Sequence, residues 1–128
     1  MKAPVVLVID DEEAVRNVAR MMLERAGFTV LTAADGREGL EVFQRRAEEI
    51  GVVLLDLTMP HMNGDEAFRA LRRIRADVPV ILASGYSEQD TSAQFAGKGI
   101  AGFIQKPFRI EKLLEQFRSV LQNRKPSI

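Results

Sequence analysis

Two hydrophobic patterns alternate along this chain. Short runs of consecutive apolar residues, rich in valine, isoleucine and leucine, predict buried strands over residues 5–9, 29–33, 52–55, 78–83 and 101–104. Between these runs, apolar residues recur every three or four positions, which predicts amphipathic helices. The predicted apolar stripes are Val15, Val18, Met22 and Ala26, then Leu40, Phe43 and Ala47, then Ala67, Leu71 and Ile74, and finally Ile110, Leu113, Leu114, Phe117 and Leu121. A helix over residues 87–97, with the weakest pattern, completes five strand–helix units.

This alternation predicts the fold class. Strands joined by helices form a parallel sheet with right-handed crossovers, and five units are too few to close a barrel. We therefore expect an α/β protein with an open, doubly wound, five-stranded parallel sheet and five helices. The runs at 29–33 and 101–104 are more polar or shorter than the others, which predicts that they are the edge strands. Ligands of such folds bind beyond the carboxyl ends of the strands.

Length and composition predict one domain over residues 1–128, with a core over about 4–122 and a frayed tail over 123–128. The 18 basic side chains are balanced by 18 acidic ones, which argues against a direct nucleic-acid or membrane-surface binder. The lack of cysteine excludes a disulfide scaffold, a thiolate metal site and a cysteine nucleophile. No run approaches the roughly 20 apolar residues of a membrane span, so we expect a cytoplasmic protein.

Polar residues that can take part in catalysis or metal binding follow four of the predicted strands. Asp10 and Asp11 follow the first strand, Asp56 the third, Ser84 the fourth and Lys106 the fifth. For Asp10 and Asp11, a role as an ordinary helix cap is as good an explanation as a functional role. It explains Asp56 less well, because the residues that follow Asp56 do not begin a helix. The parallel arrangement places all these residues at one rim of the sheet.

Clustered carboxylates predict a bound cation. Three of them repel one another unless a cation or a lysine lies among them. Oxygen ligands without nearby histidine or cysteine favour Mg²⁺, which proteins commonly hold through carboxylates, water and a phosphate oxygen. This combination indicates phosphoryl transfer, with Asp56 as the nucleophile that forms an aspartyl phosphate. Lys106 and the Ser84 hydroxyl would bind the remaining phosphoryl oxygens.

These residues resemble a known family, the receiver domains of bacterial two-component response regulators, over residues 5–121. The similarity rests on the acidic pair Asp10 and Asp11, on residues 56–64 (DLTMPHMNG), on Ser84, and on residues 103–108 (FIQKPF). It implies a flavodoxin-like, CheY-like fold with strand order 2-1-3-4-5. It also implies that Asp56 is phosphorylated in a phosphorelay.

The resemblance also assigns roles to individual residues. Mg²⁺ would be held by Asp10, Asp11, Asp56 and the backbone carbonyl of Thr58. Ser84 and Lys106 would contact the phosphoryl group, and the bond between Lys106 and Pro107 would be cis. Ser84 and Phe103 would act together as a conformational switch. For Phe103, where many members have tyrosine, the alternative is an ordinary core residue of an edge strand.

Further residues lie near the implied site. Thr58 and Tyr86 are at positions that influence phosphoryl lifetime in the family, although a surface tyrosine in a loop explains Tyr86 equally well. His61, the single histidine, is expected to be solvent-exposed. The phosphodonor histidine is therefore expected on another protein or domain, which the resemblance implies is a histidine kinase or a histidine phosphotransfer protein. Arg69, Arg72 and Arg73 are expected to form a solvated helix face.

The resemblance places the output on residues 88–121, the fourth helix, fifth strand and fifth helix, which would bind a second copy or a downstream protein. By itself the chain is expected to catalyse only its own phosphorylation and dephosphorylation. Residues 83–89 and 95–108 further resemble receivers fused to the C-terminus of hybrid sensor histidine kinases. A complete single-domain regulator is the alternative context.

Two other classes fit the sequence less well. Phosphatases of the haloacid-dehalogenase type also use a strand-end aspartate with Mg²⁺, but their Asp-x-Asp pattern lies near the first strand, and they carry a cap domain. Here Asp56 follows the third strand. A dinucleotide-binding domain needs glycines after the first strand, where this chain has residues 10–13 (DDEE).

Overall fold

The computed structural model describes residues 5–57, 64–85, 89, 95, 97 and 99–122. The elements within these residues are β1 (Val5–Ile9), α1 (Glu13–Arg25), β2 (Thr29–Ala33), α2 (Gly36–Arg46), β3 (Ile50–Asp56), α3 (Gly64–Ile74), β4 (Val80–Ser84), β5 (Gly102–Gln105) and α5 (Ile110–Gln122). Four of the five predicted helices are therefore present in the described residues. The helix predicted over 87–97 falls almost entirely outside them, as do Thr58, His61, Tyr86 and the tail.

All five strands are parallel and follow the order β2-β1-β3-β4-β5. The edge positions of β2 and β5 confirm the prediction from their shorter or more polar runs. The direction of chain progression reverses between β1 and β3, because β2 lies on one side of β1 and the later strands lie on the other. This reversal leaves a crevice at the carboxyl ends of β1 and β3, where the connections diverge.

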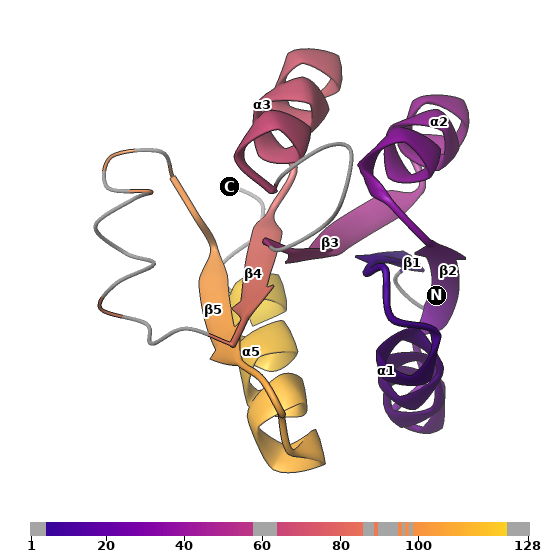
Figure 1. The fold of residues 1–128 in the computed structure, drawn as a ribbon, viewed down its shortest axis with the longest axis vertical. Coiled ribbons are helices and arrows are strands. Elements are labelled where there is room, and N and C mark those ends of the chain that lie inside the picture. Colours follow the sequence, from indigo (N-terminus) through magenta and orange to yellow (C-terminus); the bar gives the residue numbers. More distant parts are fainter. Residues whose placement is uncertain are drawn as a thin grey trace.

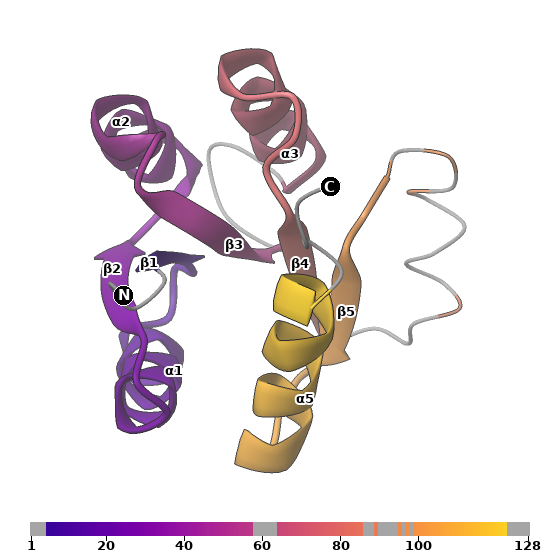
Figure 2. The same cartoon turned by 180° about the vertical axis from the view of Figure 1, so that it is seen from behind.

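Helices cover both faces of the sheet. Figures 1 and 2 show α1 and α5 on one face, and α2 and α3 on the other. Alternate residues of β1 point to opposite faces, so that Leu7 and Ile9 pack with α2 and α3, whereas Val6 and Val8 pack with α1 and α5. Burial on both faces explains why the central strands are continuous apolar runs. None of the helices in the described residues has the length and apolar character that a membrane crossing requires.

The apolar stripe of α1 differs from the prediction. Ala19 and Leu23 are the buried residues of this helix, whereas Val18 is 43% exposed and Ala26 is also exposed. The prediction of Val18 and Ala26 as stripe positions was therefore wrong, because the helix packs through the neighbouring positions. Ile74, at the end of α3, is likewise exposed.

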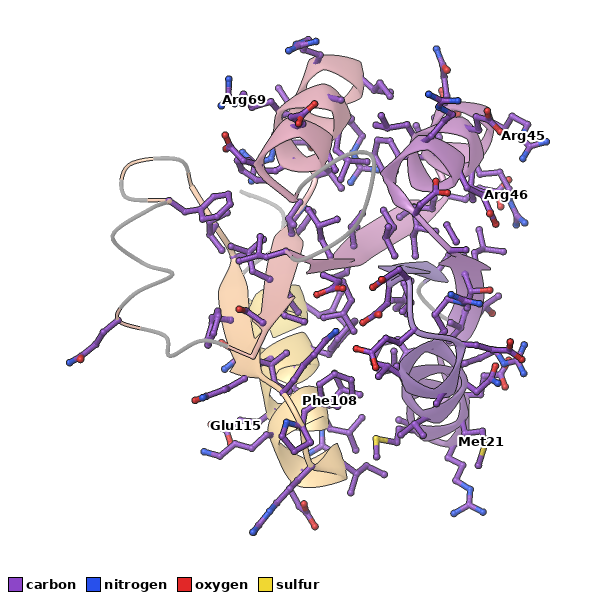
Figure 3. All side chains as sticks on the ribbon, viewed as in Figure 1. Met21, Arg45, Arg46, Arg69, Phe108 and Glu115 are labelled. Atoms are coloured by element: carbon purple, nitrogen blue, oxygen red, sulfur yellow. The ribbon has the colours of Figure 1, made fainter. Side chains whose placement is uncertain are left out.

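The arginines of α3 also depart in part from expectation. Arg69 fits a solvated face, since it points outward in Figure 3 and pairs with Asp65 on the same helix. Arg72 does not: it is partly buried, its Nη2 donates to the carbonyl oxygen of Gly99 at 2.8 Å, and its guanidinium lies over the Phe68 ring. Arg72 therefore fastens α3 to the segment that precedes β5.

Gly64 is expected to be required at the start of α3. A Cβ atom there would lie 2.5 Å from Cδ2 and 2.7 Å from Cα of Leu57, so the backbone of Leu57 would have to move. We expect Gly64→Ala to lower the free energy of unfolding by about 2 kcal/mol in urea denaturation. Gly85→Ala is the control, because a Cβ at Gly85 meets nothing within 4 Å, and it should change stability by less than about 0.5 kcal/mol. Equal losses in both variants would contradict this steric explanation.

Candidate functional site

The buried polar side chains of the described residues gather at one rim of the sheet. Asp10, Asp56 and Ser84 are 3%, 3% and 1% exposed, and each lies at the carboxyl end of a central strand. One carboxylate oxygen from each of Asp10, Asp11 and Asp56 lies within 4.8 Å of the others. The crevice between β1 and β3 therefore brings together three of the residues that the sequence indicated.

Hydrogen bonds fix Asp10 in the turn between β1 and α1. Its backbone N–H donates to the carbonyl oxygen of Ala33 at 3.1 Å, and its Oδ1 accepts the N–H of Glu12 at 2.9 Å. The cap position of α1 is Glu12, whose side chain makes no capping hydrogen bond. Asp10 therefore closes the turn ahead of the helix, and the helix-cap explanation does not account for it.

Lys106 neutralises part of this acidic cluster. Its Nζ lies 2.7 Å from Oδ2 of Asp10, 3.1 Å from Oδ1 of Asp56 and 3.8 Å from Oε1 of Glu12. Burial lowers the pKa of Lys106, but the hydrogen bond that its ammonium donates to Asp10 and the charges of Asp56 and Asp10 outweigh burial, so the pKa is raised. Lys106 is therefore a cation at neutral pH. The peptide bond between Lys106 and Pro107 is cis.

The donor set of this cluster fits Mg²⁺. Asp10, Asp11 and Asp56 offer oxygen atoms alone, and oxygen is the ligand atom that Mg²⁺ prefers. Their three negative charges exceed the single positive charge of Lys106, so the cluster retains an excess that a divalent cation can balance. The carboxylates therefore have both the chemistry and the charge to hold the metal.

The comparison with protein families agrees with this geometry. Residues 6–118 match the family model described as response regulator receiver domain. The chain belongs to this family. Membership favours the receiver interpretation over the haloacid-dehalogenase-type phosphatase.

Three similar proteins place the receiver domain among known members. The sensor kinase CckA of Brucella abortus is 34% identical over 117 residues, which cover 91% of this chain and 12% of the kinase. The solved chemotaxis protein CheY4 of Vibrio cholerae has a TM-score of 0.85 at 31% identity, covering 92% of this chain and 98% of CheY4. The solved receiver domain of the hybrid histidine kinase CckA has a TM-score of 0.79 at 33% identity, covering 92% and 99% of the two chains. The receiver domain spans about half or less of the first curated relatives that it matches.

Two further predicted site residues lie on β4 and β5. Ser84 ends β4 one position beyond Ala83, which is in register with Asp56, and its carbonyl oxygen accepts the N–H of Lys106 at 2.7 Å. Phe103 is partly buried on β5 and packs against the core between the sheet and the α2–α3 layer. The N–H of Phe103 donates to Oε1 of Gln116 on α5 at 3.3 Å.

The sequence analysis missed two residues of the site. Glu12 adds a carboxylate beside Lys106, which its position directly after the acidic pair could have indicated. Arg16 donates from Nη1 to the backbone carbonyl oxygen of Asp10 at 2.7 Å. A contact to a backbone carbonyl leaves no signature in sequence.

An apolar groove opens beside the carboxylates of the receiver domain. Its volume is about 870 Å³, and Asp56 and Lys106 lie in its wall. Figure 3 shows Phe108 on the connection to α5, on the side that faces α1. The apolar residues that line the groove are Ala14, Val15, Val18, Pro107 and Phe108.

Proposed function

We propose that this receiver domain accepts a phosphoryl group on Asp56 from a phosphohistidine of a histidine kinase or a histidine phosphotransfer protein. A carboxylate oxygen of Asp56 forms the new bond to phosphorus as the bond from phosphorus to the histidine nitrogen breaks, and the imidazole keeps the electron pair. The observation that carries the proposal is the position of Asp56, buried at the end of β3 and 3.1 Å from the Lys106 ammonium. A carboxylate beside a lysine ammonium at the end of a buried strand supports a role as the nucleophile.

The residues around Asp56 would stabilise the negative charge of the phosphoryl group during transfer. Mg²⁺ held by Asp10, Asp11 and Asp56, with the predicted carbonyl of Thr58, would neutralise phosphoryl oxygens. Lys106 would release its contacts with carboxylates to bind a phosphoryl oxygen, and the Ser84 hydroxyl would donate to another. Positive and hydrogen-bonding groups gathered around the phosphoryl group would stabilise its negative charge, which promotes phosphoryl transfer.

Phosphorylation would then act as a switch. The new group adds about −1.5 to −2 charges at a buried position. We propose that Ser84 moves toward it and that Phe103 turns inward behind Ser84, which changes the surface of β5 and α5. A second copy or a downstream protein would read this surface. Complete switching from 1:99 to 99:1 requires about 5.5 kcal/mol of differential stabilisation.

We further propose that residues 1–128 form a single receiver unit that acts in the cytoplasm. Its similarity to the receiver of a hybrid histidine kinase supports a phosphorelay context. Both a parent hybrid kinase and a single-domain regulator fit this role.

Intact mass spectrometry tests the proposal. The purified chain is incubated with acetyl phosphate and Mg²⁺, with EDTA in a parallel sample. One base-labile phosphoryl group that maps to Asp56 and is absent with EDTA is the expected result. Steady phosphate release from small phosphomonoesters without an adduct would instead favour the phosphatase and overturn the proposal.

The groove gives a separate prediction about the donor. Because Asp56 lies in its wall, a donor protein that presents a histidine to Asp56 has to cover the apolar groove. We expect Val18→Glu to slow transfer from a phosphorylated histidine phosphotransfer domain about tenfold, since a charge would be buried at the contact. Uptake from acetyl phosphate should be unchanged. Met21→Glu, on the same helix outside the groove lining, should affect neither donor, and equal slowing by both variants would contradict the assignment.

A further inference from the structure

The guanidinium of Arg16 binds a backbone carbonyl next to the acidic cluster. It lies in α1, four residues after the cap position Glu12, and its Nη1 donates to the carbonyl oxygen of Asp10 at 2.7 Å. Within the described part of the chain, Arg16 forms no ion pair. The guanidinium is therefore committed to the backbone of a residue whose side chain belongs to the acidic cluster.

This contact completes the restraint of Asp10. The N–H of Asp10 is bound to Ala33, its Oδ1 to the N–H of Glu12, and its Oδ2 to Lys106. The carbonyl group is the remaining point of attachment, and Arg16 holds it. A charge-assisted hydrogen bond is stronger than a neutral one, so this contact restricts rotation of the turn that carries Asp10 and Asp11.

We infer that Arg16 is a positioning residue for the metal-assisted phosphoryl chemistry, an inference that rests on the proposed function. By holding the Asp10 carbonyl, Arg16 fixes the turn so that the carboxylates of Asp10 and Asp11 converge with that of Asp56. Groups that orient metal ligands from outside the ligand shell typically change metal affinity by about 10- to 100-fold when they are removed.

A role of Arg16 through its charge and a role through positioning predict opposite changes in Mg²⁺ affinity when Arg16 is removed, which makes the inference testable. If Arg16 acted only through its positive charge, its removal would strengthen Mg²⁺ binding, because a cation near the site repels the metal. If Arg16 positions the turn, its removal weakens Mg²⁺ binding. Arg20 offers a matched control: it lies one turn further along α1, is exposed, and has no side-chain hydrogen bond or ion pair to a described residue.

Isothermal titration with Mg²⁺, without any phosphodonor, is the primary experiment. We expect the dissociation constant to rise about tenfold in Arg16→Ala, to be partly restored in Arg16→Lys, and to stay within about twofold of wild type in Arg20→Ala. The amide of Glu12 should also exchange its hydrogen faster in Arg16→Ala, because its acceptor is the Asp10 side chain. Urea unfolding with EDTA verifies that each variant is folded.

Two outcomes would overturn the inference. One is an Arg16→Ala protein that binds Mg²⁺ as tightly as wild type or more tightly, and the other is equal weakening in Arg16→Ala and Arg20→Ala. A wild-type protein that binds Mg²⁺ but takes up no phosphoryl group would refute the proposed function alone, and the titration would still decide the role of Arg16.

Discussion

Asp56→Asn is expected to take up no phosphoryl group from acetyl phosphate or from a phosphohistidine donor. The amide nitrogen and oxygen of asparagine are poor nucleophiles, and the oxygen lacks the negative charge that attacks phosphorus. Asp56 is 3% exposed and is one of three clustered carboxylates, so its neutralisation also relieves repulsion. We therefore expect the free energy of unfolding, measured with EDTA, to stay unchanged or to rise by about 1 kcal/mol.

Intact mass and urea denaturation check the two parts of this prediction. Glu41→Gln is a suitable control, since it removes an exposed carboxylate from α2, away from the site. It should accept a phosphoryl group as wild type does. Stoichiometric phosphorylation of Asp56→Asn would show that another residue is the acceptor.

Lys106→Met is expected to destabilise the protein, most of all in the absence of Mg²⁺. Asp10 and Asp56 are both buried, and Lys106 is a cation in contact with both. Without it, two buried carboxylates lose this compensation, which should cost about 3 kcal/mol in EDTA. Removal of the ammonium, which repels the metal, should also tighten Mg²⁺ binding, so the same Mg²⁺ concentration should stabilise Lys106→Met more than wild type. Phosphoryl uptake should fall sharply even at saturating Mg²⁺, because a phosphoryl oxygen loses its ligand.

Urea denaturation in EDTA and in Mg²⁺ measures this dependence. Lys112→Met, which removes an exposed lysine of α5, should leave stability within about 0.5 kcal/mol of wild type in both conditions. A Lys106→Met protein as stable as wild type in EDTA would mean that Lys106 does not offset the charges of the buried carboxylates.

Much of the fold could be predicted from local patterns. The continuous apolar runs identified the buried strands because a strand covered on both faces has no polar side to alternate with. The strand order came from the family resemblance, since periodicity alone does not say which strands are neighbours. The face of α1 was predicted wrongly at Val18, because Ala19 is small and contributes little to an apolar stripe although it is fully buried.

Some residues of the candidate site could likewise be predicted from the sequence, and others could not. Asp10, Asp56 and Lys106 could be predicted to meet because each directly follows or ends a parallel strand, and the carboxyl ends of such strands share one rim. Arg16 could not be predicted, because it donates to a backbone carbonyl whose position depends on the finished tertiary structure, and the same holds outside the site for Arg72. A side chain that binds the backbone, such as Arg16, is therefore the part of this site that depends on the three-dimensional structure.

The contact between Gln116 and β5 has a consequence for solubility. An edge strand with free N–H groups can template strand addition from another molecule, the first step toward fibrous aggregates. Here the outward N–H of Phe103 is already bound to the Gln116 amide, and a Cβ at the adjacent Gly102 would lie only 2.4 Å from the same oxygen. Gln116 thus fills the position that an incoming strand would occupy. Strand addition from a second copy is therefore disfavoured at Phe103.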